Sequence, residues 1–191
     1  MTTPTDKNQA PATKVTTWEI DPAASRVEFS ARMRLMFLAN ITVKGRFADV
    51  RGTLTGDASD PTTGQVSVTI GAASLDTKMP ARDKHLRSAD FFEIDNYPNL
   101  TFTSRRIEAL DQAQGHYRVS GLLTIRDVAR EVSLDAWYAP QEAGKERHTF
   151  NLSAVFNRRD FGLVWSRPQQ KIADDVTITL HIELTPTASP V

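Results

Sequence analysis

The 191-residue sequence contains no cysteine. This absence excludes disulfide bonds, thiolate zinc sites, iron–sulfur clusters and a cysteine nucleophile. Neither sign of charge is in surplus, since 23 Lys and Arg residues are balanced by 23 Asp and Glu residues. Nonspecific binding of nucleic acid needs extra cations to displace phosphate counterions, so we expect no nucleic-acid partner. No apolar run approaches the ~18 residues of a membrane span, and we do not expect the chain to cross a bilayer.

Signatures of catalysis and metal binding are missing as well. The sequence has no glycine-rich phosphate loop, no His-Glu-x-x-His segment and no nucleophile elbow. Its histidines lie at positions 85, 116, 148 and 181, and no two are within five residues, so no local metal pair forms. We therefore expect no metal, no cofactor and no catalytic residue. We interpret His116, His148 and His181 as solvated surface residues.

The length suffices for one domain with a full core. Hydrophobic residues at 40% and charged residues at 24% argue against global disorder. We divide the chain into an N-terminal tail (1–14), a barrel domain (15–186) and a C-terminal tail (187–191). The first tail lacks the apolar core of ~7–15 residues that a secretory signal needs, which favours a cytoplasmic location. Homodimer formation is an expectation based only on the general frequency of symmetric assemblies.

The dominant pattern is an alternation of apolar and polar residues with a period of two, which is typical of half-buried strands. The clearest example is 175–184, where the even-numbered residues from Val176 to Leu184 are apolar. Shorter examples occur at 27–31, 66–70, 100–102, 117–125, 132–138 and 150–156, and 43–54 has the pattern of a broken strand or a hairpin. About eight strands with short polar turns predict an all-β fold. We favour a closed antiparallel barrel over a sandwich because closure removes exposed sheet edges.

Residues 80–90 interrupt this alternation. Pro80 suits a first helical turn, and Asp83 with Arg87 has the i, i+4 spacing that supports a helix. We predict a short helix here, followed by two aromatic residues, Phe91 and Phe92, that need cover. The charged residues around His85 have two interpretations: a polar cluster that orients a ligand head group or gates a pocket, or a solvated helix whose charges pair among themselves.

A second unusual segment, 157–165, combines an amide, two arginines, a carboxylate and two aromatic residues. It can form the rim of a cavity, with Arg158 paired to a carboxylate and with Phe161 and Trp165 on the wall. The alternative is a long connection that core aromatic residues and an internal Arg–Asp pair hold in place.

Eight blocks in a fixed order resemble a known family. They are WEIDP (18–22), SRVEF (25–29), GRF (45–47), SLDT (74–77), RDKHLRSADFF (82–92), YPNLTF (97–102), GLLTIR (121–126) and NRRDFGLVW (157–165). In this order, over residues 18 to about 184, they are similar to the bacterial YceI-like lipid and polyisoprenoid-binding family. The resemblance implies an extended, eight-stranded, lipocalin-like antiparallel barrel with an elongated apolar tunnel. It implies an isoprenoid or other long-chain lipid as the ligand, for example a quinone tail or a polyprenyl phosphate, and no catalytic activity.

The chain departs from the family pattern at three positions. Ala24 and Met33 stand where the family has histidine, and Asp127 stands where it has glycine. If those histidines touch a head group in other members, these contacts are missing here.

Two sets of candidate ligand-binding residues follow. The tunnel-lining set is Phe29, Phe47, Phe92, Phe102, Tyr117, Leu123, Phe150, Phe156, Phe161 and Trp165. The polar-rim set is Arg82, Asp83, His85, Asn157 and Arg158. The favoured function is non-enzymatic binding or carriage of a long-chain isoprenoid or similar amphiphile.

Two alternatives stay open. One is an enzyme acting on such a lipid, with His85, Asp83 and Arg158 as its acid–base set. The other is a structural or partner-binding domain with a filled barrel. Alternation does not decide between a tunnel and a packed core, because a barrel of eight strands has room for either.

Overall fold

The structure is a computed structural model that describes residues 15–35, 40–57, 59–139, 147–165 and 170–187. The tail predicted for 1–14 and the last four residues of the tail predicted for 187–191 lie outside the described residues.

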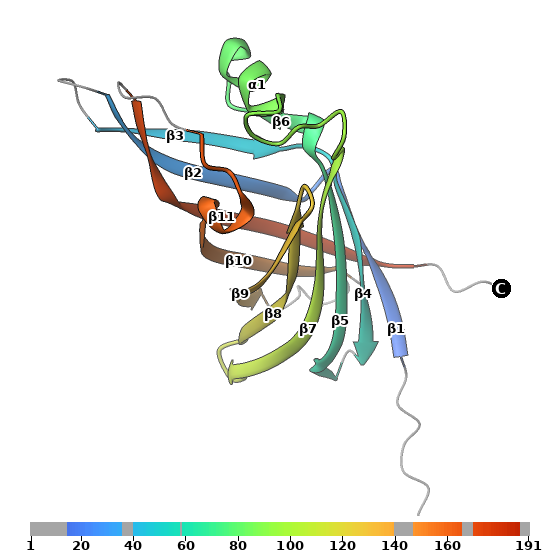
Figure 1. The fold of residues 1–191 in the computed structure, drawn as a ribbon. Helices are drawn as coiled ribbons and strands as arrows, with labels where there is room; N and C mark the ends of the chain where they lie inside the picture. The colour runs from blue at the N-terminus through green and yellow to red at the C-terminus, as the bar shows by residue number, and fades with distance from the viewer. Residues whose placement is uncertain (1–14, 36–39, 58, 140–146, 166–169, 188–191) are drawn as a thin grey trace, which may run out of the picture.

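Eight antiparallel strands form a closed barrel, as the alternation and the resemblance both predicted (Figure 1). In order around the barrel they are β1 (Val15–Ile20), β4 (Val50–Asp57), β5 (Asp60–Gly71), β7 (Asn99–Asp111), β8 (His116–Ile125), β9 (Val128–Ala139), β10 (His148–Asn157) and β11 (Gln170–Pro186). The ring closes where Trp18 to Ile20 of β1 pair with Leu184 to Pro186 of β11. Because β1 and β11 hydrogen-bond to each other there, neither the first nor the last strand of the barrel has an unpaired edge at the closure.

Three further strands, β2 (Arg26–Leu35), β3 (Asn40–Phe47) and β6 (Leu75–Asp76), extend the sheet beyond this ring. They branch off because β11 is 17 residues long and pairs with two strands along one edge, with β2 from Gln170 to His181 and with β1 after that. Figure 1 shows β2 and β3 reaching past the barrel at the upper left, together with the first part of β11.

The segment predicted as a broken strand or a hairpin is a broken strand. Strand β3 pairs with β2 and β6, whereas β4 pairs with β1 and β5, and the two do not pair with each other. The break lies at Ala48 and Asp49, where Ala48 N donates to Ser74 Oγ and Gly71 N donates to Asp49 O. Ser74 belongs to the short helix η1 (Ala72–Ser74), and Gly71 precedes it. Their two hydrogen bonds give the backbone groups of Ala48 and Asp49 partners at the bend, so the chain turns there without leaving these groups unpaired.

The short helix predicted near 80–90 is α1 (Pro80–Arg87), with Pro80 in its first turn. The two aromatic residues after it are covered as expected. Phe91 is buried beside the His85 ring, with 5.2 Å between ring centroids, and Phe92 packs edge-on against Phe47 at 5.8 Å. This end of the barrel, near α1 and β6 in Figure 1, is therefore filled by aromatic packing.

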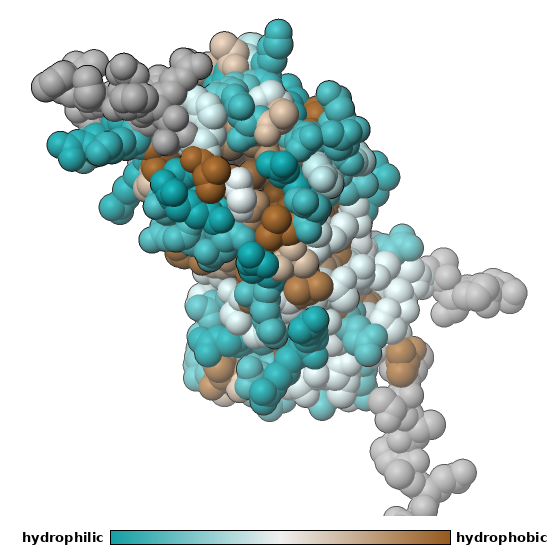
Figure 2. All heavy atoms as spheres, in the orientation of Figure 1, coloured by the Kyte–Doolittle hydropathy of each residue, from teal (hydrophilic) through white to brown (hydrophobic). Residues whose placement is uncertain are grey.

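The outer surface contrasts with the apolar interior. Figure 2 shows a mostly hydrophilic face on which hydrophobic residues are scattered. Among the residues that the structure describes, no helix is both long enough and apolar enough to span a bilayer.

Candidate ligand-binding cavity

An apolar cavity of about 160 Å³ lies inside the barrel. All eight barrel strands and β2 contribute side chains to it. The lining residues are Ile20, Val27, Thr53, Leu54, Pro61, Val66, Val68, Ile70, Phe102, Ile107, Tyr117, Val119, Leu123, Val132, Leu134, Ala136, Phe150, Leu152, Phe156, Ile178, Leu180, Ile182 and Leu184. None of these described residues carries a charge, so the cavity offers burial and shape rather than ion pairing.

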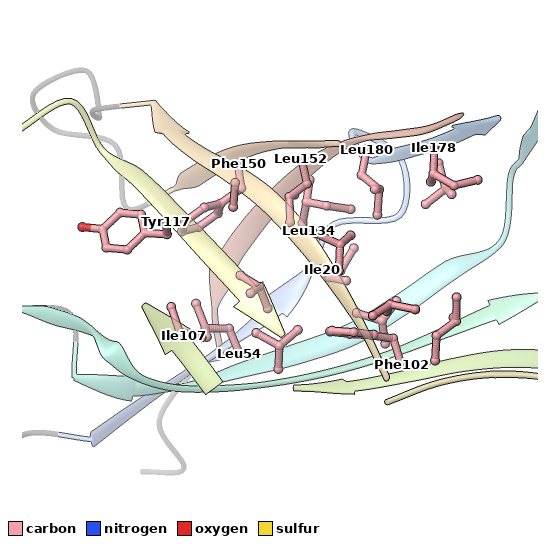
Figure 3. Close-up of a pocket in the computed structure, with 18 of the residues that line it drawn as sticks. Ile20, Leu54, Phe102, Ile107, Tyr117, Leu134, Phe150, Leu152, Ile178 and Leu180 are labelled. Atoms are coloured by element: carbon pink, nitrogen blue, oxygen red, sulfur yellow. The ribbon is translucent and has the colours of Figure 1, made fainter. Parts of the chain in front are cut away.

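The strand register explains why the interior is apolar. Tyr117 lies opposite Ala136, Ala136 opposite Leu152, and Leu152 opposite Leu180, so one inward-facing row crosses four strands. Because side chains alternate between the two faces of a strand, every second residue in each strand adds to the same surface. Figure 3 shows the result: Phe150, Leu152, Leu180 and Ile178 point across the cavity toward Leu54, Ile107 and Phe102.

The cavity is long and narrow. Its lining runs along β8 from Tyr117 to Leu123, a distance of about 20 Å at roughly 3.4 Å per residue. Its volume is close to the ~150 Å³ of dry apolar cavities that hold a single benzene molecule. The cavity as it stands therefore accommodates about one isoprene unit, and a longer chain requires lining side chains to change rotamer.

The ten residues of the predicted tunnel-lining set divide into two groups. Phe102, Tyr117, Leu123, Phe150 and Phe156 line the cavity. The other five do not line it and pack in the core or against neighbouring rings: Phe29, Phe47, Phe92, Phe161 and Trp165. Phe29 and Phe92 both contact Phe47, and Trp165 contacts Phe91, so these rings fill space against one another.

In the predicted polar-rim set, the residues of α1 bond to neighbouring chain segments. Asp83 is buried and accepts hydrogen bonds from Thr77 N, at 3.0 Å, and from Thr77 Oγ1. Arg82 donates to Thr77 O at 2.8 Å and to Thr77 Oγ1 at 2.7 Å. His85 Nε2 lies 2.8 Å from Asp90 Oδ2. None of the three lines the cavity; the bonds of Arg82 and Asp83 fix α1 to the segment before it, and the bond of His85 fixes it to the segment after it.

The remaining members, Asn157 and Arg158, belong to η2 (Arg158–Phe161) and its N-cap. Asn157 Oδ1 accepts a hydrogen bond from Arg159 N at 3.0 Å. Arg158 is only 5% exposed and donates to the carbonyl oxygens of Leu163, Trp165, Ile172 and Ala173.

Arg158 also bonds Asp174 Oδ1 at 3.0 Å, in agreement with the predicted Arg–carboxylate pair. Burial lowers the pKa of Arg158, and the carboxylate of Asp174 opposes that shift. The hydrogen bond from Arg159 lowers the pKa of Asp174, with a smaller effect from Arg158. This buried cation holds two chain segments together, and neither Asn157 nor Arg158 lines the cavity. Contact between the polar-rim residues and a ligand stays a prediction.

Two polar residues that the sequence reasoning did not select, Tyr138 and His148, lie beside the cavity, and Tyr138 packs on its lining residue Phe150. Tyr138 Oη and His148 Nδ1 are 3.0 Å apart, and the His148 ring meets Trp18 edge-on at 5.3 Å. Burial lowers the pKa of His148 and raises that of Tyr138, with a further contribution from Tyr117. The solvated-surface interpretation is therefore wrong for His148. The signal was present in the alternation, since 148, 150 and 152 share one face of β10.

The three positions that depart from the family pattern, Ala24, Met33 and Asp127, are not among the lining residues. Within the described part of the chain, no group of three or more His, Cys, Asp or Glu residues could hold a metal ion.

Comparison with known proteins identifies relatives of this chain. The YceI-like domain profile matches residues 18–184. Protein YceI of Escherichia coli O157:H7 is 35% identical over 133 residues, 68% of each chain. The crystal structure of Burkholderia cenocepacia BcnA superposes with a TM-score of 0.72 at 25% identity, covering 86% of this chain and 98% of that one. A polyisoprenoid-binding domain of Saccharophagus degradans, implicated in plant cell wall breakdown, shares the fold with a TM-score of 0.66. It is 16% identical, with coverage of 91% and 100%.

Proposed function

The chain belongs to the YceI-like family, and from this premise we propose that its barrel binds the chain of an isoprenoid or similar long-chain lipid without converting it chemically. The observation that carries the proposal is the uncharged, apolar lining of a cavity that follows the strands for about 20 Å. Similarity of fold to a domain described as polyisoprenoid-binding adds support.

The energetics of burial are compatible with this function. Each buried CH₂ contributes about 0.8 kcal/mol, so one five-carbon isoprene unit contributes roughly 3–4 kcal/mol. Association costs about 4–15 kcal/mol in lost translational and rotational freedom. A few buried units therefore offset that cost, and no charged anchor is required. Since the unliganded cavity holds about one unit, the lining must widen to accept the others, and the barrel then selects ligands by chain width and length.

The positions of the three proposed acid–base residues favour binding over catalysis. His85 pairs with Asp90, Asp83 bonds to Thr77, and Arg158 is held by backbone carbonyl oxygens. Each group is engaged in holding the chain together outside the cavity lining, so none is positioned against a lipid in the barrel.

The test is to purify the protein under native conditions, extract it with organic solvent and analyse the extract by mass spectrometry. We expect a copurifying long-chain lipid, and a stripped sample should bind an added polyprenol or quinone. Repeated absence of any lipid, together with no binding of the added compounds, would refute the function.

A further inference from the structure

A small chamber adjoins the apolar cavity at the end of the barrel opposite α1, and its mostly apolar lining includes a few polar side chains. We call it the end chamber; its lining includes Trp18, Asp57, Tyr138 and His148. Its volume is about 50 Å³. Leu54, Pro61 and Phe150 line both spaces, so the chamber lies directly beside the cavity and these three side chains separate the two. The terminal group of a lipid whose chain lies in the cavity can therefore lie next to the end chamber.

The hydrogen bond between Tyr138 and His148 in the end chamber leaves one further N–H or O–H group of the pair able to donate. If Tyr138 Oη donates to His148 Nδ1, the ring carries its proton on Nε2 and can donate there; if Nδ1 donates instead, the tyrosine proton is available. Either tautomer supplies one donor to an oxygen acceptor. Figure 3 shows Tyr117 at one end of the cavity with its hydroxyl directed away from the other labelled side chains. Tyr138 packs against the cluster that contains Tyr117.

The charges around the end chamber are unsuited to an anion. Of the described residues that line it, none is Lys or Arg, and the charged one is Asp57. Hydrogen bonds from Ser59 lower the pKa of Asp57, which keeps it negative. Burial keeps His148 neutral at neutral pH by lowering its pKa. Arg147, the nearest cation along the chain, is directed to Asp21 and Glu183, at 3.3 and 3.1 Å.

From this geometry we propose that the end chamber binds a small uncharged head group, a hydroxyl or carbonyl, through Tyr138 and His148 while the lipid chain occupies the cavity. A phosphate or diphosphate would lose its hydration shell beside a carboxylate with no cation among the described lining residues to compensate, which is strongly unfavourable. The small volume of the chamber also excludes bulky head groups. This inference rests on the proposed function, because it assigns the polar end of the same ligand.

The test compares three ligands with the same fifteen-carbon chain by calorimetry: farnesol, farnesyl diphosphate and farnesene, which has no head group. We expect farnesol to bind at least about tenfold more tightly than the diphosphate. Tyr138→Phe keeps the ring that packs on Phe150 at 5.1 Å but removes the hydroxyl. It should weaken farnesol binding by about five- to tenfold, the worth of one hydrogen bond, and leave farnesene binding unchanged.

His148→Gln is a second variant of the end chamber. The matched control is Tyr97→Phe, because Tyr97 lines neither the cavity nor the end chamber, and we expect it to bind farnesol with wild-type affinity. Tighter binding of the diphosphate overturns the assignment. So does unchanged farnesol affinity in both end-chamber variants, or equal losses for farnesol and farnesene. If farnesene and farnesol both fail to bind the wild-type protein, the proposed function itself fails. Binding of farnesene with a preference for the diphosphate refutes the head-group inference alone.

Discussion

A larger side chain that projects into the cavity tests the central claim that the ligand binds in the cavity. Ala136 is 2% exposed and lies between Tyr117 and Leu152 in the inward-facing row. Ala136→Leu adds three carbon atoms to the lining and displaces about as many ligand carbons. At about 0.8 kcal/mol each, we expect a loss of roughly 2.4 kcal/mol, or about 50-fold in the Kd for farnesene.

The same substitution should leave the fold intact. The added carbons gain up to about 2 kcal/mol from burial in a dry cavity, against about 1–3 kcal/mol for strain in a well-packed one, so the two effects nearly cancel. Ala129→Leu, on the exposed part of the same strand, is the matched control and should bind normally. The assay is calorimetry with farnesene alongside thermal unfolding. A Kd within threefold of wild type for Ala136→Leu refutes the reasoning, provided that the variant melts as a folded protein.

Three further predictions concern stability. Arg158→Met leaves several backbone carbonyls without their donor, at about 1–3 kcal/mol for each buried group, and should lower the free energy of unfolding in urea by about 3 kcal/mol or more; a loss below about 1 kcal/mol would contradict this role. Asp83→Ala leaves the two Thr77 donors without their carboxylate and should cost about 1–3 kcal/mol in the same assay, and an unchanged midpoint would argue against it. Burial lowers the pKa of His148 from 6.5, so as pH falls below that value the unfolded chain takes up the proton first. Its contribution is therefore full above pH 6.5 and is lost as pH falls toward the folded pKa. His148→Gln should flatten this slope in urea titrations between about pH 7.5 and 5.5, and an equal slope in the variant would be inconsistent with the burial.

Much of the fold was predictable because local patterns carry it. Alternation located the strands from Val66 to Leu184, and Pro80 with the Asp83–Arg87 spacing located α1. The long reach of β11 was not predictable, since nothing in its alternation shows that β2 and β1 share one of its edges. That sharing depends on pairing between residues more than a hundred positions apart.

The candidate site was predictable in part. Phe102, Tyr117 and Phe150 line the cavity as their positions on inward faces indicated. Phe47 and Phe161 were predicted for the tunnel as well, yet they do not line the cavity and are buried in the core cluster. His148 was assigned to the surface because an isolated histidine gives no local signal of a partner, and its partner Tyr138 is brought to it by the pairing of β9 with β10.

The sequence by itself determined which face of each strand is apolar and, through its ordered blocks, the family to which the chain belongs. Only the tertiary structure decided that these apolar faces enclose a narrow cavity near the middle of the barrel, whereas near α1 the apolar side chains pack against one another. The physical reason is that the separation of opposite walls depends on barrel closure and on the summed volumes of side chains from different strands, which no single segment encodes.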